Sequence, residues 1–146
     1  MLDALRVLGS AQAVTTATTT RTTNTVDFGG DFDMGPGEAK GIMFVINVTG
    51  DFTTGDETHN FQLRTDDNTS FSSPTILAET GVRNGNTLTA GTRIVLALPN
   101  ENERYIEGAV VSAGTSPNIT WSCYYGLLKD MLSGPNTVSA SGLVVG

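Results

Sequence analysis

The chain has 146 residues, with 38% hydrophobic side chains, 16% charged side chains and a formal net charge of −7. This length predicts one domain with a sizeable core, and the composition excludes a coiled coil, collagen, and a disulfide scaffold. The 8 Lys and Arg residues are never adjacent, so we expect neither a nucleic acid nor an anionic membrane surface as a partner.

The N-terminal segment, residues 1–13, carries Leu2, Leu5 and Leu8 at a three-residue step. This spacing predicts either a short helix or an extended arm whose leucines dock on a partner. Residues 14–28 are rich in threonine, whose β-branched side chain favours strands, and predict a strand at a sheet edge. Asp3 and Arg6 break the apolar stretch that a secretion signal needs, and the single cysteine fits a reducing compartment.

The middle of the chain alternates apolar and polar residues, and we assign residues 14–128 to one β-sandwich domain. The clearest period-two segments, each ended by turn residues, are 42–48, 59–65, 94–98, 105–112 and 119–125. Both faces of 42–48 are apolar, which predicts a central strand, whereas only the odd positions of 59–65 are expected to face inward. The fold class is therefore all-β, an antiparallel sandwich or jelly roll of about eight strands with extended terminal segments.

The last segment, residues 129–146, combines apolar residues with Gly-Pro and serine spacers. We expect a C-terminal tail laid on a neighbour, or an extra strand. The longest apolar runs, 42–46 and 94–98, are far shorter than the roughly 20 residues of a spanning helix, so no membrane span is expected.

Side chains suited to catalysis are few. His59 is the only histidine, no nucleophile elbow accompanies it, and we expect it simply to begin a strand. One histidine and one cysteine do not complete a zinc site within one chain. We therefore expect no enzyme activity, no metal and no cofactor.

The acidic residues leave two alternatives open. The pairs Asp31/Asp33 and Asp66/Asp67 lie in turn-rich sequence, where carboxylates usually cap the backbone rather than hydrolyse glycosides. Oxygen ligands for calcium occur at 31–33 and 51–57, although neither segment has a complete ligand spacing.

The aromatic and thiol side chains of 119–125 lie on two opposite faces of the predicted strand, according to whether their position is odd or even. Trp121 and Cys123 are expected in the core, the latter as a small buried hydrophobe. Tyr124 has the opposite parity, and the pattern does not decide whether it faces solvent, another sheet or a partner.

The N-terminal string 1–5 with 11–15 is the most specific of several recognisable segments. The others are the turn 33–38 before 42–48, residues 61–66, Phe71, and residues 76–78, 93–99 and 104–106. Together these segments, over about residues 1–128, resemble the Bbp16-like capsid cement, or decoration, proteins of tailed bacteriophages. The segment after Lys129 lies outside the matching pattern.

The resemblance implies a jelly-roll structural protein of the virion, made in the bacterial cytoplasm and located on the outer surface of the phage head. There it is expected to bridge major capsid protein subunits and to form a homo-oligomer, a dimer or a trimer. We expect the capsid or intersubunit contacts to come from apolar residues at the two ends of the chain: Leu2, Leu5, Leu8, Leu143, Val144 and Val145. The alternative is a carbohydrate-binding jelly roll for host attachment, with Trp121 or Tyr124 in an exposed groove.

Overall fold

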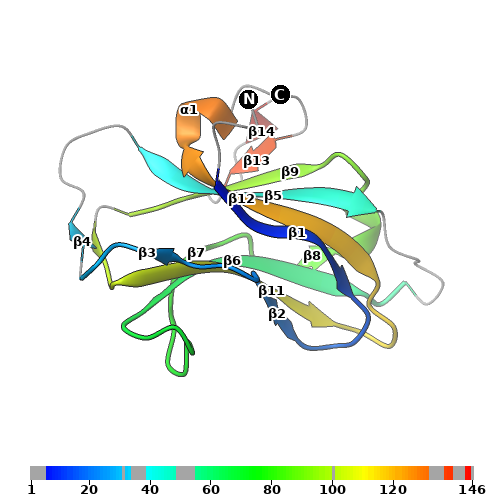
Figure 1. The fold of residues 1–146 in the computed structure, drawn as a ribbon. Coiled ribbons are helices and arrows are strands. Elements are labelled where there is room, and N and C mark those ends of the chain that lie inside the picture. The colour runs from blue at the N-terminus through cyan, green and yellow to red at the C-terminus, as the bar shows by residue number, and fades with distance from the viewer. Residues whose placement is uncertain are drawn as a thin grey trace.

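The computed structural model describes residues 6–30, 32–33, 39–48, 55–99, 101–131, 137–139 and 144–145, those in β4, β10, β13 and β14 by their backbone only. These residues form two stacked β-sheets (Figure 1). The expected all-β sandwich is confirmed.

The first sheet has the strand order β1-β12-β5-β9-β13-β14. Its strands are β1 (Arg6–Val14), β12 (Ile119–Leu127), β5 (Lys40–Val48), β9 (Arg93–Ala97), β13 (Thr137–Ser139) and β14 (Val144–Val145). Neighbouring strands are antiparallel except β13, which runs parallel to β9.

The second sheet has the order β2-β11-β6-β7, with β3 beside β11 and β8 beside β6. Its strands are β2 (Thr19–Arg21), β3 (Val26–Asp27), β6 (Thr58–Asp66), β7 (Thr75–Glu79), β8 (Arg83–Asn84) and β11 (Tyr105–Ala113). A separate pair joins β4 (Phe32–Asp33) and β10 (Glu101–Asn102), and the described helices are a 3₁₀ turn (Gly85–Thr87) and α1 (Leu128–Met131).

The connectivity of the principal strands is that of a jelly roll. Taken in chain order, β1, β2, β5, β6, β7, β9, β11 and β12 change sheet at every step except from β6 to β7, and they produce the neighbours β1-β12-β5-β9 and β2-β11-β6-β7. Every pair within these two rows is antiparallel, as expected for two interlocked Greek keys.

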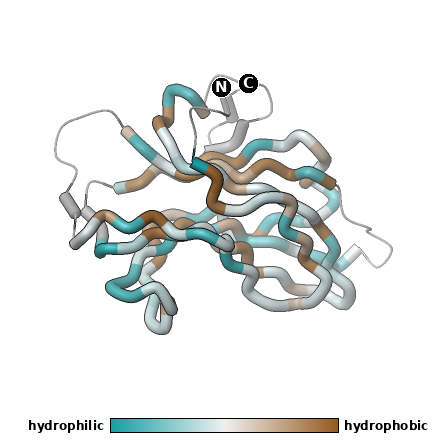
Figure 2. Tube along the Cα trace, in the orientation of Figure 1, coloured by the Kyte–Doolittle hydropathy of each residue, from teal (hydrophilic) through white to brown (hydrophobic). Residues whose placement is uncertain are grey.

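The core lies between the sheets and follows the predicted alternation. The inward residues of β5 and β6 include Phe44 and Phe61, both 0% exposed. Phe44 contacts Phe61 and Trp121 edge-on, with ring centroids 5.1 Å and 5.3 Å apart. Brown, apolar stretches are interspersed with white and teal ones along the strands of both sheets in Figure 2. Edge-to-face aromatic packing adds about 0.5–1.5 kcal/mol per pair to the burial of apolar area.

Gly108 in β11 makes room for this aromatic cluster. A Cβ atom at this position would lie 2.9 Å from Phe44 Cζ and 3.1 Å from Cys123 Sγ. Real Cβ atoms do not tolerate the first of these distances. The glycine therefore lets the β11 backbone approach the ring from the opposite sheet, and it blurs the alternation that marks β11 in the sequence.

The N-terminal segment differs from the expectation, whereas the threonine-rich and C-terminal segments contribute strands. Residues 6–14 form β1, not the arm or short helix expected for 1–13, and register shifts between Val7/Gly9 and Gly9/Gln12 explain why their period-two pattern is irregular. Residues 14–28 contribute two short strands, β2 and β3, along the edge of the second sheet. Within 129–146, β13 and β14 extend the first sheet.

The outer face of the first sheet carries a second apolar cluster. Met43 from β5, Val95 from β9 and Met131 from α1 are each at most 1% exposed. Tyr124 and Leu128 pack against this cluster, so Tyr124 faces the cover of its own sheet. Both faces of β5 are thus buried, which confirms the central position expected for 42–48. Among the described helices, α1 included, there is none with the length and hydropathy of a bilayer span.

Candidate interaction surface

The predicted contact residues fall into three groups. Leu2, Leu5 and Leu143 lie outside the described residues, and Val144 and Val145 are described only as the backbone of β14. Leu8 is 0% exposed and belongs to the main core cluster. It packs inside its own chain because β1 joins the first sheet, and it therefore offers no surface to a partner.

The outer face of the second sheet holds a buried carboxylate between two arginines. Glu107 in β11 is 0% exposed, and its Oε2 accepts a hydrogen bond from Arg21 Nε at 2.5 Å. Arg64 lies opposite Glu107 on β6, with Nη1 3.9 Å from Oε1. Burial raises the pKa of Glu107, while the hydrogen bond and charge of Arg21 oppose the rise. The negative charge of Glu107 therefore lies below the surface of this face, between the two arginines.

Residues 67–73 form a loop that covers this charged group; in Figure 1 the loop hangs on the side of the second sheet away from the first. Asp66, 4% exposed, accepts from the backbone N–H of Asn68 at 3.2 Å and of Ser73 at 3.1 Å. Arg21 donates to the carbonyls of Thr69 and Ser70, each at 3.0 Å. The Asp66 carboxylate thus stabilises the loop by bonding to its backbone, and the Arg21 guanidinium connects the loop to the sheet.

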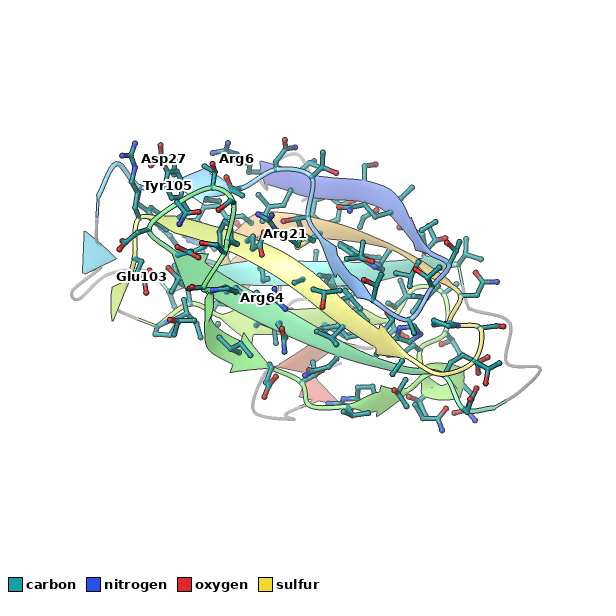
Figure 3. The ribbon with its side chains drawn as sticks, turned by 90° about the horizontal axis from the view of Figure 1, so that it is seen from below. Arg6, Arg21, Asp27, Arg64, Glu103 and Tyr105 are labelled. Carbon is teal, nitrogen blue, oxygen red and sulfur yellow. The ribbon has the colours of Figure 1, made fainter. Side chains whose placement is uncertain are left out.

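A polar cleft opens beside the loop. Its volume is about 470 Å³, and its lining consists of Arg6, Arg21, Thr69 and residues 22–25. Figure 3 looks onto this side of the molecule and labels both arginines. Apart from the arginines, the lining side chains are threonines and one asparagine, all hydrogen-bonding groups.

An exposed ion pair lies near one end of this face. Arg104 donates to both carboxylate oxygens of Asp27, at 2.8 Å from Nε and 3.1 Å from Nη2. Arg104 and the backbone N–H of Gly29 hold the pKa of Asp27 below its usual range. The guanidinium also lies over the ring of Tyr105, 4.9 Å from its centroid. The positive charge of Arg104 is therefore already committed to Asp27.

His59 lies inside the sandwich near one end. It is the second residue of β6, as expected, and its side chain is 0% exposed. Its Nδ1 is 2.8 Å from Ser112 Oγ, while Nε2 is buried and has no hydrogen-bond partner among the described residues. Burial lowers the pKa of His59, and the nearby charge of Glu57 partly opposes this. This serine–histidine pair joins β6 to β11 within the core, a pairing that the sequence does not reveal.

The remaining candidate residues occupy structural positions. Trp121 and Cys123 are both 0% exposed, and burial raises the pKa of the Cys123 thiol. Asp66 serves the covering loop, as turn carboxylates were expected to do. Asp31 and Asp51 lie outside the described residues, as does the side chain of Asp33. Within the described ranges, no three His, Cys, Asp or Glu side chains come together as a metal site.

Large apolar side chains are exposed at scattered positions. They are Val7 in β1, Val48 at the end of β5, Ile76 in β7 and Val82 between β7 and β8, which are 46%, 57%, 47% and 73% exposed. Val7 and Ile76 belong to strands at sheet edges, whereas Val48 and Val82 lie outside or at the end of a strand. Isolated exposures of this kind are common on protein surfaces and define no apolar patch.

Comparison with known proteins gives one family match. The family model described as Bbp16 matches residues 8–120, which runs from β1 to the beginning of β12 and so includes all or part of every principal jelly-roll strand. No curated protein matches the chain.

Proposed function

The chain belongs to the Bbp16 family, and from this we propose that it is a cement, or decoration, protein on the outer surface of a tailed-phage head. The observation that carries the proposal is the family match over 8–120, which is compatible with a phage structural protein. In this role the protein bridges subunits of the major capsid protein and stabilises the shell. Its location is the virion, after synthesis in the cytoplasm of the bacterial host.

The physics of the fold supports such a role. A ligand that binds only the assembled shell stabilises it by mass action. Contacts repeated over a lattice act together, so modest single contacts give strong total binding. A bridge of this kind must keep its shape under load, and the aromatic core between two hydrogen-bonded sheets provides stiffness.

The proposed partners are the major capsid protein and further copies of this chain, as a dimer or a trimer. We assign the contacts to apolar residues at the chain ends, namely Leu2, Leu5, Leu143, Val144 and Val145, and leave out the buried Leu8. Each leucine that a contact buries fully contributes roughly 1.5–3 kcal/mol, less the entropy of ordering. Removal of residues 1–5 tests the N-terminal half of this assignment, because it leaves β1 intact.

A non-enzymatic role is part of the proposal. His59 and the Ser112 hydroxyl beside it, together with the Cys123 thiol, are at most 4% exposed, which shields these three side chains from substrate in solution. Trp121, the residue that a sugar-binding groove was expected to use, is buried at 0% exposure. Tyr124 packs under the cover of the first sheet. These positions favour packing roles for the aromatic residues, and we do not advance the carbohydrate-binding alternative.

Quantitative mass spectrometry of purified particles tests this proposal. We expect a copy number in fixed ratio to the major capsid protein, with a value that the lattice symmetry allows. Light scattering of the isolated protein then gives the dimer or trimer mass. Absence of the protein from purified particles, or a few copies per particle, would contradict a cement role.

A further inference from the structure

The polar cleft beside β1 contains one arginine without an ion-pair partner among the described residues. The Arg6 side chain is exposed and lines the cleft. Within the described part of the chain its guanidinium forms no ion pair or hydrogen bond, and its charge only opposes the rise that burial causes in the pKa of Tyr125, its neighbour across β1 and β12. Tyr125 is neutral at neutral pH, because burial raises its pKa above the ordinary 10.0. The charge of Arg6 therefore points to a partner outside this part of the chain.

Arg21 on the same cleft retains hydrogen-bond capacity. A guanidinium has five N–H donors. Three of those of Arg21 are used, by Glu107, Thr69 and Ser70, and the side chain is 36% exposed. Two N–H groups remain on a guanidinium whose orientation is fixed from behind. Such prior positioning lowers the entropy cost of binding a ligand.

The backbone that forms the rest of the cleft is also held in place. Thr22 N–H donates to Gly108 O and Asn24 N–H to Leu8 O, each at 2.9 Å. Thr23 N–H donates to Gln12 Oε1 at 3.2 Å. The cleft is thus built on hydrogen bonds to β1 and β11 and is present before any ligand arrives.

The charge balance of the cleft selects the kind of ligand. The charged side chains that line the cleft are Arg6 and Arg21, and Arg21 shares the carboxylate of Glu107 with Arg64. Among the described residues, the cleft therefore carries an excess of positive charge at Arg6. A singly charged carboxylate matches this excess better than a phosphate, which carries close to two negative charges at neutral pH. A volume of about 470 Å³ has room for one acidic side chain with its flanking backbone.

We propose that this cleft binds a carboxylate of a protein partner, with Arg6 as the charge partner and Arg21 as the oriented second donor. The carboxylate chemistry follows from the cleft itself. The assignment to a protein, and so to an Asp or Glu side chain of a neighbouring capsid component, rests on the proposed function.

Amide and arginine Nε signals in NMR spectra of the ¹⁵N-labelled full chain test the inference at constant ionic strength. The probes are a blocked Gly-Glu-Gly tripeptide, its Gly-Gln-Gly counterpart, glucuronate and inorganic phosphate. We expect the glutamate peptide to shift signals of residues 22–25 and of Arg21 saturably. Replacement of Glu by Gln in the peptide, or Arg6→Gln in the protein, should each weaken binding at least about tenfold, the value of one charge-assisted hydrogen bond.

Arg83→Gln is the matched control, because it removes the same charge from β8, which lies across β6 and β11 from β2. It should leave binding unchanged. Equal shifts with both peptides, or full binding by the Arg6→Gln variant, would overturn the inference. If phosphate binds more tightly than the glutamate peptide, the assignment of a carboxylate ligand is wrong. If glucuronate binds more tightly than the glutamate peptide, the assignment of that carboxylate to a protein is wrong. If the protein binds the glutamate peptide but is absent from purified particles, the proposed function is wrong, whereas carboxylate binding by the cleft is still supported.

Discussion

The outer faces of the two sheets are covered by different chemistry. On the first sheet, α1 places Met131 against Met43 and Val95, and Arg93 from β9 donates a hydrogen bond to the carbonyl of Met131. On the second sheet, loop 67–73 is held by Arg21 above the buried Glu107, and part of that guanidinium remains exposed. The first cover therefore consists mainly of buried apolar side chains, whereas the second leaves part of the Arg21 guanidinium exposed to a partner.

The largest effect is expected at the charged cover. Glu107→Ala removes the carboxylate between Arg21 and Arg64, and we expect about 3 kcal/mol loss in the free energy of unfolding, the lower part of the range for a buried pair because Arg21 is 36% exposed. Urea unfolding measures the change, and hydrogen exchange should show faster exchange in 67–73. Glu107→Gln, which keeps the shape, is the control with a smaller loss. A fully stable Glu107→Ala variant would show that the charges do not hold the loop.

The apolar cover is expected to respond less. Met131→Ala should cost about 2 kcal/mol, because a buried side chain is removed from a small cluster, and Met131→Leu about 1 kcal/mol or less. Thermal unfolding of both variants gives the comparison. Loss of stability that depends strongly on salt concentration would contradict the apolar nature of this contact.

The interior beneath the second sheet gives a pH-dependent effect. His59 has a lower pKa in the folded chain than its ordinary 6.5, so the unfolded chain takes up the proton first as the pH falls. Its contribution to stability is therefore present above about pH 6.5 and is lost as the pH falls from there toward the folded pKa. Urea unfolding at several pH values should give a shallower pH dependence for His59→Gln than for the parent chain. Parallel curves would contradict a buried neutral histidine.

The smallest effect is expected at the exposed ion pair. Asp27 and Arg104 are paired on the surface, where solvent and salt screen their attraction. Asp27→Asn should leave the melting temperature essentially unchanged, although the pKa of Asp27 is low. A large drop in the melting temperature would show that surface pairing contributes as much as the buried charges.

The alternation of the sequence predicted the strands that have a regular inner face. Phe44, Phe61 and Trp121 occupy the predicted inward positions because each lies in a strand with an unbroken period of two. The N-terminal strand β1 was missed because two register shifts break its period of two. The three-residue step of Leu2, Leu5 and Leu8 in the sequence also favoured a helix. Jelly-roll pairing is set by contacts far apart in sequence, which a local pattern does not contain.

The interaction surface was less predictable. Glu107 lies beside Gly108 and Ala109, so apolar and polar residues do not alternate clearly along its strand. The local sequence also does not reveal that an arginine from the threonine-rich segment pairs with Glu107. Arg6 and Arg21 are 15 positions apart in the sequence. They line the same cleft because β1 and β2 lie on the same side of the sandwich. The one local signal was the presence of an isolated arginine within a run of threonines.

We propose that this jelly roll decorates the outside of a phage head and bridges capsid subunits. A cryo-electron microscopy reconstruction of purified particles is the decisive experiment for this proposal. We expect density of the sandwich on the outer surface, at joints between major capsid protein subunits and repeated with the symmetry of the lattice. A shell without such density, or the sandwich located inside the head or in the tail alone, would contradict it.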